Sequence, residues 1–338
     1  MMTKIYSLFY LLIIFGCSST EEQQLKLNII PLTIPVDASF RGLHAVNENI
    51  AWLSGSKGIY MRTVDGGVNW EYGSFLDSVD FRDIHAFDKD VAIMISAGIP
   101  AVIYKTEDGG KNWSLKYKND DPRVFFDAID FWDNLHGIAF SDSFEGRFFM
   151  ITTSDGGNSW EQLPSAPVSI DGEGGFAASG TNMVVSGTSD IWIGTTTGRV
   201  IYSGDRGISW ESFGSPLQNS ENPTAGIFSV AISKGSGLLV GGDFQQPDNS
   251  ENNVAILKNG SWEQPESGPM GFRSCVVFIP ETSIAVSTGT SGTDISYDNG
   301  ENWKSLDSIG YHTISFGKTA SSGWMSGGRG LVAKIKVE

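Results

Sequence analysis

Short apolar segments separated by polar, glycine-rich turns recur along the chain from about residue 25 onward. In the first complete unit these segments occupy 40–46, 50–55, 58–63 and 69–74. Apolar segments of this length, opening on an aromatic residue and bounded by turn residues, are typical of β-strands. No long stretch with helical periodicity follows the amino terminus. The pattern therefore predicts an all-β protein built from repeated four-stranded sheets.

The third and fourth segments of each unit are joined by a turn that the chain repeats. It first reads Thr-Val-Asp-Gly-Gly-Val-Asn-Trp at 63–70, and a weaker copy lies at 258–262. The tryptophans of the six copies are spaced by 43, 47, 50, 52 and 41 residues, a period typical of propeller blades. The five complete copies contain Asp65, Asp108, Asp155, Asp205 and Asp298, and they end on Trp70, Trp113, Trp160, Trp210 and Trp303.

The repeated turn has a structural explanation. The carboxylate of its aspartate can accept N–H hydrogen bonds across a tight bend, and the glycine that follows supplies the positive φ that such a bend requires. The tryptophan enters the next strand, where its apolar face can lie between neighbouring sheets. Because the copies belong to different blades and lie far apart, we expect the aspartates to stabilise turns rather than to form a catalytic or metal site.

The number of blades depends on the two ends of the chain. After Trp303, three segments between 311 and 337 make strands of a further blade that has no Asp turn and no fourth strand. The missing strand is available at 25–35, and pairing of 28–33 with 331–336 would close a seven-bladed ring and remove its open edge. A six-bladed ring is the alternative. The inner strands of the second to sixth blades are expected to begin near 81, 125, 176, 227 and 272.

The first residues of the chain predict export and a lipid anchor. A single lysine precedes the apolar run 5–15, which has the length of a signal-peptide core and is too short to span a bilayer. The pair Gly16-Cys17 that follows resembles the lipobox of bacterial lipoproteins, where the cysteine is lipidated and becomes the first residue. We therefore expect Cys17 to attach the protein to a membrane.

These features divide the chain into a signal peptide at 1–16, a flexible tether at 17–24 and a single propeller domain at 25–338. The anchor predicts a bacterial cell-envelope location, and Ser18 resembles the pattern of lipoproteins sent to the outer membrane. Since the chain has two cysteines and one is the predicted anchor, no intrachain disulfide is expected, and Cys275 is expected to be a buried apolar residue.

The formal net charge is −16. A strongly acidic chain is a poor candidate for nucleic-acid binding, which depends on neutralising phosphates with lysine and arginine. The charge is instead suited to solubility, and we expect a monomer.

Function is expected on the face opposite the Asp turns. The loops that lead into the inner strands lie there, and three of them carry the same Phe-Arg dipeptide, at 40–41, 81–82 and 272–273. Arginines at equivalent positions should converge near the mouth of the channel, where guanidinium groups suit a carboxylate, a phosphate or an acidic protein segment. The alternative is that the arginines and acids of this face only pair with one another. The predicted ligand-binding residues are Arg41, Arg82, Arg273, Glu173 and Asp243.

An enzyme is the alternative hypothesis. A glycan hydrolase or lyase would use an acid pair at the channel mouth, with carboxylates about 5 to 9.5 Å apart for glycoside hydrolysis. His44 and His85 occupy the same repeat position, so blade packing explains them better than metal binding. No ligand spacing indicates a metal, and no cofactor is expected. The candidate acids are Asp127, Asp142, Glu173 and Asp243.

The repeated turns resemble the Asp boxes, or BNR repeats, of sialidases and several non-catalytic propellers. Sialidases carry an early Phe/Tyr-Arg-Ile-Pro motif, whereas here Phe40-Arg41 continues as Gly42-Leu43, and no clear Tyr and Glu nucleophile pair is present. The chain is more similar to the photosystem II stability/assembly factor-like family of propellers. The stretches that carry this resemblance, which covers almost all of the mature chain, are 40–43, 154–157, 172–182, 241–244 and 271–274.

This resemblance implies a β-propeller. Photosynthetic members of the family act as assembly chaperones for a membrane complex, and heterotrophic relatives are often loosely labelled oxidoreductases. No dinucleotide or flavin fingerprint is present here. The sequence thus favours a lipid-anchored, non-catalytic propeller that acts as a protein-binding or assembly scaffold in the cell envelope.

Overall fold

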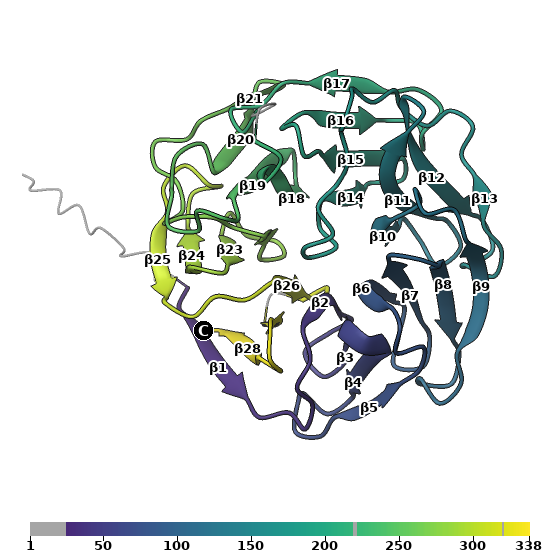
Figure 1. Cartoon of the computed structure of the whole chain (residues 1–338). Helices are drawn as coiled ribbons and strands as arrows, with labels where there is room; N and C mark the ends of the chain where they lie inside the picture. Colours follow the sequence, from purple (N-terminus) through teal and green to yellow (C-terminus); the bar gives the residue numbers. More distant parts are fainter. Residues whose placement is uncertain (1–24, 219–221, 320) are drawn as a thin grey trace, which may run out of the picture.

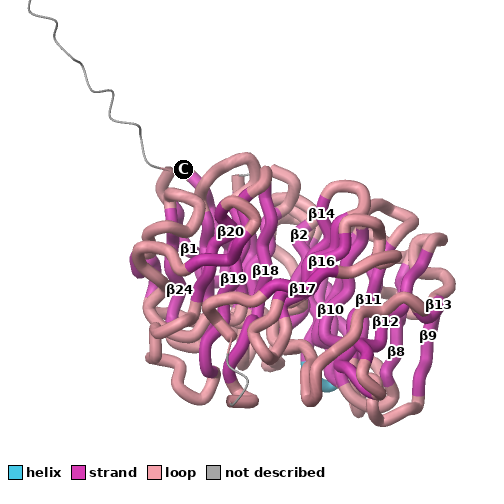
Figure 2. The backbone as a smooth tube through the Cα atoms, turned by 90° about the horizontal axis from the view of Figure 1, so that it is seen from above, coloured by secondary structure: helices cyan, strands magenta, loops and turns pink. Residues whose placement is uncertain are grey.

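The computed structural model describes residues 25–218, 222–319 and 321–338, which form a closed ring of strands around a central axis (Figure 1). Within these residues, 28 strands make seven antiparallel sheets of four strands each. Seen from the side, the strands run between two layers of loops (Figure 2). The predicted all-β propeller with seven four-stranded blades is confirmed, and the six-bladed alternative is wrong.

The strands of each blade follow one another from the axis outward. The first two blades contain β2 Phe40–Ala45, β3 Ala51–Gly55, β4 Ile59–Thr63, β5 Glu71–Ser74, β6 Asp80–Ala86, β7 Ala92–Ala97, β8 Ala101–Thr106 and β9 Ser114–Asn119. The third and fourth contain β10 Phe126–Phe131, β11 Gly137–Phe144, β12 Arg147–Thr153, β13 Glu161–Gln162, β14 Met183–Ser186, β15 Asp190–Gly194, β16 Val200–Ser203 and β17 Glu211–Phe213. The fifth and sixth contain β18 Ala225–Ser233, β19 Ser236–Asp243, β20 Val254–Lys258, β21 Ser261–Glu263, β22 Cys275–Phe278, β23 Ala285–Gly289, β24 Gly292–Ser296 and β25 Lys304–Asp307. The seventh contains β26 Thr313–Phe316, β27 Ser322–Ser326, β28 Val332–Val337 and β1 Leu27–Leu32, and a short 3-10 helix, η1 Ser56–Gly58, precedes β4.

The last blade is built from both ends of the chain. Strand β1 pairs antiparallel with β28, with Asn28 opposite Lys336 and Leu32 opposite Val332. The order β1-β28-β27-β26 makes β1 the outermost strand of this blade, as Figure 1 shows. The predicted closure by the N-terminal strand is confirmed in the expected register. The pairing supplies the fourth strand that the C-terminal part of the sequence lacks. The outer edge of β28 is therefore paired rather than open.

Apolar side chains fill the spaces between neighbouring blades. Between the seventh and first blades, Phe40, Leu53 and Trp324 are buried together without measurable exposure. Trp70, which ends the first Asp box, meets Trp324 edge-on with ring centroids 5.7 Å apart. Because each blade buries apolar surface against the two beside it, the ring is held by the hydrophobic effect at every interface.

The Asp boxes use their polar groups inside each turn. In the first box, Asp65 Oδ1 accepts hydrogen bonds from the Asn69 N–H at 2.9 Å and from the Thr63 hydroxyl at 3.0 Å. Gly66 and Gly67 have φ values of 76° and 89°, which residues with a Cβ rarely adopt. Hydrogen bonds from Asn69 hold the pKa of Asp65 below its ordinary value. The same hydrogen bond to the carboxylate recurs at Asp108, Asp155, Asp205 and Asp298.

Two inner strands begin later than predicted. Strand β14 starts at Met183 rather than near 176, and β22 starts at Cys275 rather than at 272. Asn182 and Ser274, directly before these strands, still each make one backbone hydrogen bond to the second strand of their blade, whereas residues 176–181 bond mainly to other blades. In the fourth blade this displacement builds part of the candidate site.

The predicted signal peptide at 1–16, the predicted lipidation site Cys17 and the tether at 17–24 lie outside the described residues. In the ranges that the structure describes, no helix is both long and apolar enough to cross a bilayer. Cys275 is fully buried, and burial raises the pKa of its thiol. A protonated thiol in this position behaves as a small apolar side chain.

Candidate functional site

Residues 176–182 of the fourth blade cross the central channel, and we call this segment the channel floor. It follows the outer strand of the third blade, yet it hydrogen-bonds to residues of five other blades. For example, the Ser179 hydroxyl donates to the Ser274 carbonyl at 2.7 Å, and the Thr313 hydroxyl donates to the Ser179 carbonyl at 3.2 Å. The floor therefore divides the channel into two cavities.

A glycine allows the floor to pass close to the second blade. Gly180 has a φ of 71°, and a Cβ at this position would lie 2.2 Å from a carboxylate oxygen of Asp83. Asp83 is held in place because it accepts N–H hydrogen bonds from Ile84 and Ile129, both at 2.8 Å. Both the backbone conformation and the close approach therefore require glycine here.

Arg41 and Arg82 line a cavity above the floor, which we call the arginine mouth. Arg41 donates to the Ala178 carbonyl at 3.0 Å, and Arg82 donates to the Ala177 carbonyl at 3.4 Å. Asp80, 3.8 Å from Arg82, is the one carboxylate of the described residues that pairs with either guanidinium. Burial and the charge of Arg82 lower the pKa of Arg41 to about 10, so Arg41 stays charged at neutral pH. The mouth thus carries positive charge that its own acids do not fully balance.

Arg273 does not join them, and the expectation that three arginines converge is wrong at this position. The Arg273 side chain is 1% exposed, and its Nε donates to Asp294 Oδ2 at 2.5 Å. Its Nη2 contacts the same carboxylate, while Nη1 donates to the Phe272 carbonyl and the Ser291 hydroxyl at 2.7 and 2.8 Å. Because these donors are all used inside the sixth blade, Arg273 is a structural residue.

The third strand of each blade explains the difference. Asp294 lies on β24, two residues before the box residue Ser296. At the corresponding position, two residues before the box threonine, the first and second blades carry Met61 and Tyr104. The sixth blade therefore has a carboxylate that binds its arginine, whereas the other two leave theirs to reach the floor. The aspartate on this strand is visible in the sequence and indicates that the arginine of the sixth blade is paired. The repeated dipeptide alone does not show this.

Four phenylalanines form the wall of the arginine mouth. Phe176 stacks on Phe228 with ring centroids 3.7 Å apart, and Phe228 meets the edge of Phe272 at 4.7 Å. Phe244, 46% exposed, completes the group at 6.3 Å from Phe228. Sequence reasoning did not assign them to a site, although three of the four lie in stretches that carry the family resemblance.

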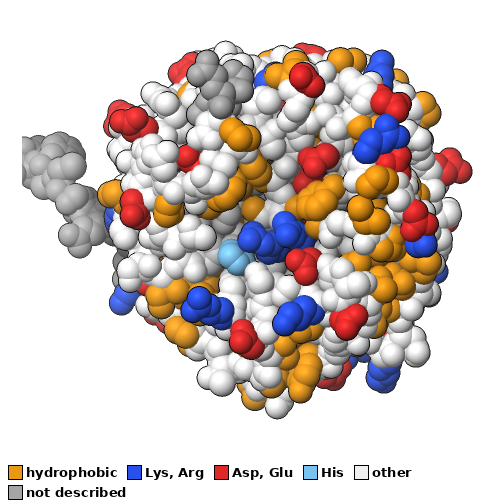
Figure 3. Space-filling view, in the orientation of Figure 1, with side chains coloured by type: hydrophobic (Ala, Val, Ile, Leu, Met, Phe, Trp, Pro, Cys, Tyr) orange, Lys and Arg blue, Asp and Glu red, His pale blue; other side chains and the backbone are white. Residues whose placement is uncertain are grey.

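The space between the arginines and the phenylalanines has a volume of about 260 Å³. Its basic groups mark the centre of the ring in Figure 3, with a histidine beside them. His312 lines this space, and burial together with the charges of Arg41 and Arg82 lowers its pKa to about 4. The imidazole is therefore neutral at neutral pH. Two guanidinium groups next to an apolar wall suit a ligand that carries a carboxylate beside an apolar group.

Glu173 and Asp243 were predicted at the ligand site. Each instead accepts hydrogen bonds from side chains close to it. Glu173 accepts hydrogen bonds from Arg199 Nε at 2.9 Å and the Thr197 hydroxyl at 2.7 Å. Burial opposes ionisation of Glu173, but these hydrogen bonds, Arg199 foremost, lower its pKa. Asp243 accepts the Thr224 hydroxyl at 2.6 Å, and this bond is the main cause of its lowered pKa. Neither acid lines the arginine mouth.

Asp127 and Asp142 lie in a different environment in the third blade. Asp127 is fully buried, and neither carboxylate oxygen has a hydrogen-bond partner among the described residues. Burial, and secondarily the charge of Asp142, raises the pKa of Asp127 well above its ordinary value. Asp142 accepts the Gly175 N–H at 2.9 Å, and burial raises its pKa as well. An enzyme would need two of the predicted acids in the mouth, and none of the four lines it.

Three of the four histidines lie in the channel, on both sides of the floor, and His136 lies outside it. His44 and His85 lie below the floor with ring centroids 4.4 Å apart, whereas His312 lies above it. Across the part of the chain that the structure describes, no group of three or more His, Cys, Asp or Glu side chains is arranged to hold a metal ion.

A family model described as "Photosynthesis system II assembly factor YCF48" matches residues 17–122. This part of the chain contains the first two Asp boxes and both arginines of the arginine mouth. The resemblance inferred from the sequence is confirmed by this match. No curated protein matches the chain.

Two solved structures share the fold. One, described as "YCF48 bound to D1 peptide", covers 92% of this chain and 97% of that chain, with a TM-score of 0.67 and 16% sequence identity. The other, "YCF48 from Cyanidioschyzon merolae", covers 91% of this chain and 98% of that chain, with a TM-score of 0.64 and 16% identity. At such low identity the similarity concerns the fold alone.

Proposed function

We propose that this propeller, similar to the YCF48 assembly factors, is a non-catalytic scaffold that binds a partner protein at the arginine mouth. The observation that carries the proposal is the placement of Arg41 and Arg82 against a phenylalanine wall in one cavity. A solved protein of the same fold is described as bound to a peptide, which supports protein binding as the activity.

The segment that fits the arginine mouth is acidic and carries an apolar side chain. Each guanidinium presents a planar set of donors that matches a carboxylate. The carbonyls of Ala177 and Ala178 each accept one N–H from an arginine. These bonds orient the guanidinium groups before a ligand arrives, which reduces the entropy lost on binding. Phe176 and Phe244 would contact the apolar group of the ligand.

We also propose that the protein acts at a membrane surface in the bacterial cell envelope, held by a lipid on Cys17. This rests on the apolar run at 5–15 and the Gly16-Cys17 pair. Mass spectrometry of the mature protein should show loss of residues 1–16 and a lipid on Cys17. An unmodified Cys17, or an intact amino terminus, would exclude the anchor.

A crosslinking pull-down from envelope extract tests binding at the mouth. The wild type should recover a partner that a variant with Arg41→Ala and Arg82→Ala does not. A synthetic peptide from the crosslinked segment should then bind the wild type, and its binding should weaken when its Asp and Glu residues are replaced by Asn and Gln. Equal recovery by wild type and double variant would exclude this mouth as the binding site.

Arg123→Ala is the matched control for the pull-down. Arg123 lies in the loop before β10, on the same face, and its side chain is 49% exposed. It is already paired with Asp121 at 2.7 Å and with Glu145 at 2.6 Å. Since its charge is balanced and it lies outside the arginine mouth, its removal should leave partner recovery unchanged.

A further inference from the structure

A second cavity lies on the other side of the channel floor, and the proposed function does not use it. It has a volume of about 430 Å³, and all seven inner strands contribute to its lining. Ser179 and Thr181 of the floor close one end. We call it the lower cavity, because it lies toward the face that carries the Asp boxes.

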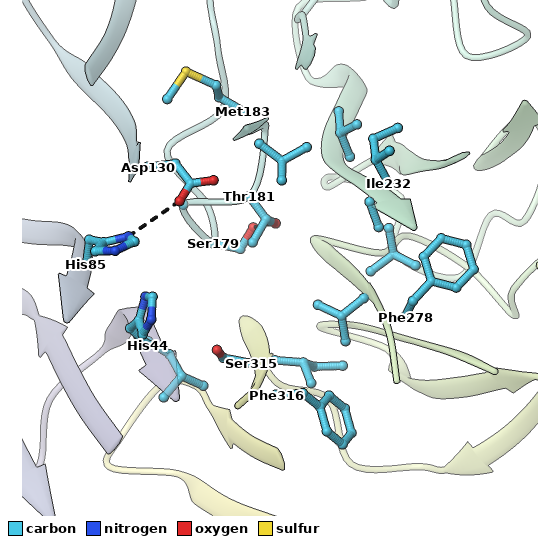
Figure 4. A pocket seen from close by; sticks show the side chains of 18 of the residues that line it. His44, His85, Asp130, Ser179, Thr181, Met183, Ile232, Phe278, Ser315 and Phe316 are labelled. Carbon is cyan, nitrogen blue, oxygen red and sulfur yellow. Dashed lines mark hydrogen bonds and ion pairs between the residues drawn. The ribbon is translucent and has the colours of Figure 1, made fainter. Parts of the chain in front are cut away.

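The lower cavity has one polar wall and one apolar wall (Figure 4). The polar wall comes from the first three blades, and the apolar wall from the fifth, sixth and seventh. Asp130 is fixed in the polar wall, because it lies 3.4 Å from His85 Nδ1 and accepts two backbone N–H hydrogen bonds at 2.8 and 2.9 Å. The facing side chains are His44, His85 and Asp130 on one side and Ile232, Phe278 and Phe316 on the other.

His44 offers a hydrogen-bond acceptor that the protein does not use. Its ring lies against His85, and it makes no hydrogen bond to a residue of the described ranges. Burial, together with His85 and Lys318, lowers the pKa of His44 well below its ordinary value. The imidazole is therefore neutral at neutral pH, and one ring nitrogen keeps a free lone pair.

The ionisable groups that line the lower cavity, apart from the histidines, are all acids. They are Asp83, Asp130 and Glu281, and no Lys or Arg of the described residues lines it. Glu281 is paired with Lys234 at 2.6 Å, and burial raises the pKa of Asp83 well above its ordinary value. Asp130, with a side chain 24% exposed, is left as the carboxylate that attracts a ligand. Lys318 is near enough to act on His44 but does not line the cavity, so an anion would meet this carboxylate without a lysine or arginine in contact with it.

We propose that the lower cavity binds a small organic ammonium ion with an apolar body. Asp130 and the free nitrogen of His44 would accept the ammonium N–H groups, and the body would contact Ile232, Phe278 and Phe316. A metal ion fits less well, because the described residues contain no metal-holding group of side chains and the facing wall is apolar.

Three probes of similar shape test the charge of the ligand: 2-phenylethylamine, 2-phenylethanol and 3-phenylpropionate. In isothermal titration calorimetry at pH 7, the amine should bind about tenfold tighter than the alcohol, because it forms charge-assisted hydrogen bonds. The carboxylate should show no measurable binding. Equal affinities for amine and alcohol, tighter binding of the carboxylate, or no binding of the amine at millimolar concentration would overturn the proposal.

NMR on histidine labelled with ¹³C in the ring locates the bound amine. The chain has four histidines, of which His44 and His85 line the lower cavity, while His136 and His312 lie elsewhere. The amine should shift the signals of His44 and His85 and leave the other two unchanged. A shift of His312 instead would place the amine in the arginine mouth and overturn the proposal.

Substitutions separate this site from the arginine mouth. Asp130→Asn keeps the side-chain shape and should weaken amine binding about tenfold, with the alcohol unchanged. Glu281→Gln, at an acid already paired with a lysine, should leave both affinities within about twofold. The variant with Arg41→Ala and Arg82→Ala should bind the amine like the wild type, so this proposal and the proposed function can fail independently. Unchanged amine affinity in Asp130→Asn would overturn the assignment.

Discussion

The first and sixth blades carry the same Phe-Arg dipeptide before their inner strands, but they use its arginine in opposite ways. In the first blade, Arg41 reaches the channel floor and lines an open cavity. In the sixth, Arg273 is buried against Asp294. The difference comes from the third strand, where the first blade has Met61 and the sixth has Asp294. The repeated motif thus places the arginine at an equivalent backbone position in each blade. The nearest side chain of opposite charge then determines where the guanidinium group lies.

This difference predicts two kinds of response to substitution. A buried ion pair that loses one member leaves a desolvated charge, which destabilises the fold strongly. An arginine at the edge of a cavity can be removed at little cost to the fold, but its ligand loses a partner. Substitutions in the sixth blade should therefore change stability, and those in the first blade should change binding.

Asp294→Ala should have the largest effect. It leaves the Arg273 guanidinium buried without its carboxylate, so the free energy of unfolding should fall by about 3–5 kcal/mol. Adding Arg273→Met should restore most of the loss, because an apolar side chain removes the unpaired charge. Urea unfolding followed by tryptophan fluorescence measures both variants. A double variant as unstable as the single one would show that the pair does not act as a unit.

Gly180→Ala tests the floor on which Arg41 lies. Its left-handed φ and the 2.2 Å approach of a Cβ to Asp83 should lower the unfolding free energy by about 2–3 kcal/mol. Gly172→Ala is the matched control, because Gly172 has a φ of 70° and nothing within 4 Å of a Cβ. That variant should lose about 1 kcal/mol. If both variants lose the same unfolding free energy, the close approach to Asp83 adds nothing to the cost of the left-handed φ.

Asp127→Asn should stabilise the protein, since Asp127 is a buried acid without the arginine that Asp294 has. The raised pKa of Asp127 means that the folded state holds its proton more tightly than the unfolded chain does. Wild-type stability is therefore reduced as pH rises from about 4 through the folded-state pKa. At pH 7 the variant should be more stable by about 1–2 kcal/mol, and the gain should shrink toward pH 4. A gain that is independent of pH would contradict this explanation.

Arg41→Ala should have the smallest effect on the fold, a change of no more than about 1 kcal/mol in unfolding free energy. It should nevertheless weaken binding of an acidic peptide about tenfold, because one of two guanidinium groups is lost. Arg41→Lys keeps the charge without the planar donor set and should recover only part of the affinity. A stability loss as large as that of Asp294→Ala would show that Arg41 is also a structural residue.

The fold could be predicted because its determinants are local or periodic. The Asp-Gly turn is specified within a few residues, as the bonds from Asn69 and Thr63 to Asp65 show. The spacing of this turn indicates where one blade ends and the next begins. Because only three strands of the last blade follow residue 303, the segment at 25–35 was predicted to be its fourth strand. The pairing of Asn28 with Lys336 followed from that complementarity.

The candidate site was predicted in part. The repeated dipeptide brought Arg41 and Arg82 to one cavity, but it placed Arg273 wrongly and omitted His312 and the phenylalanine wall. The stretch 172–182 was recognised for its resemblance, yet its residues 176–182 were predicted to begin an inner strand. They form the channel floor instead, because their polar groups find partners on five other blades.

The strand pattern and the strand that closes the ring could be predicted from the sequence, since they follow from short turns and a regular period, whereas the pairing of β1 with β28 distinguished seven blades from six. Which charges remain free could not be predicted from the sequence, because it depends on contacts between blades. The bond from Arg41 to Ala178 joins residues 137 positions apart, and such a contact depends on how whole blades are packed. A charge buried beside an opposite charge is neutralised, whereas one at a cavity is available to a ligand, and no local pattern distinguishes the two.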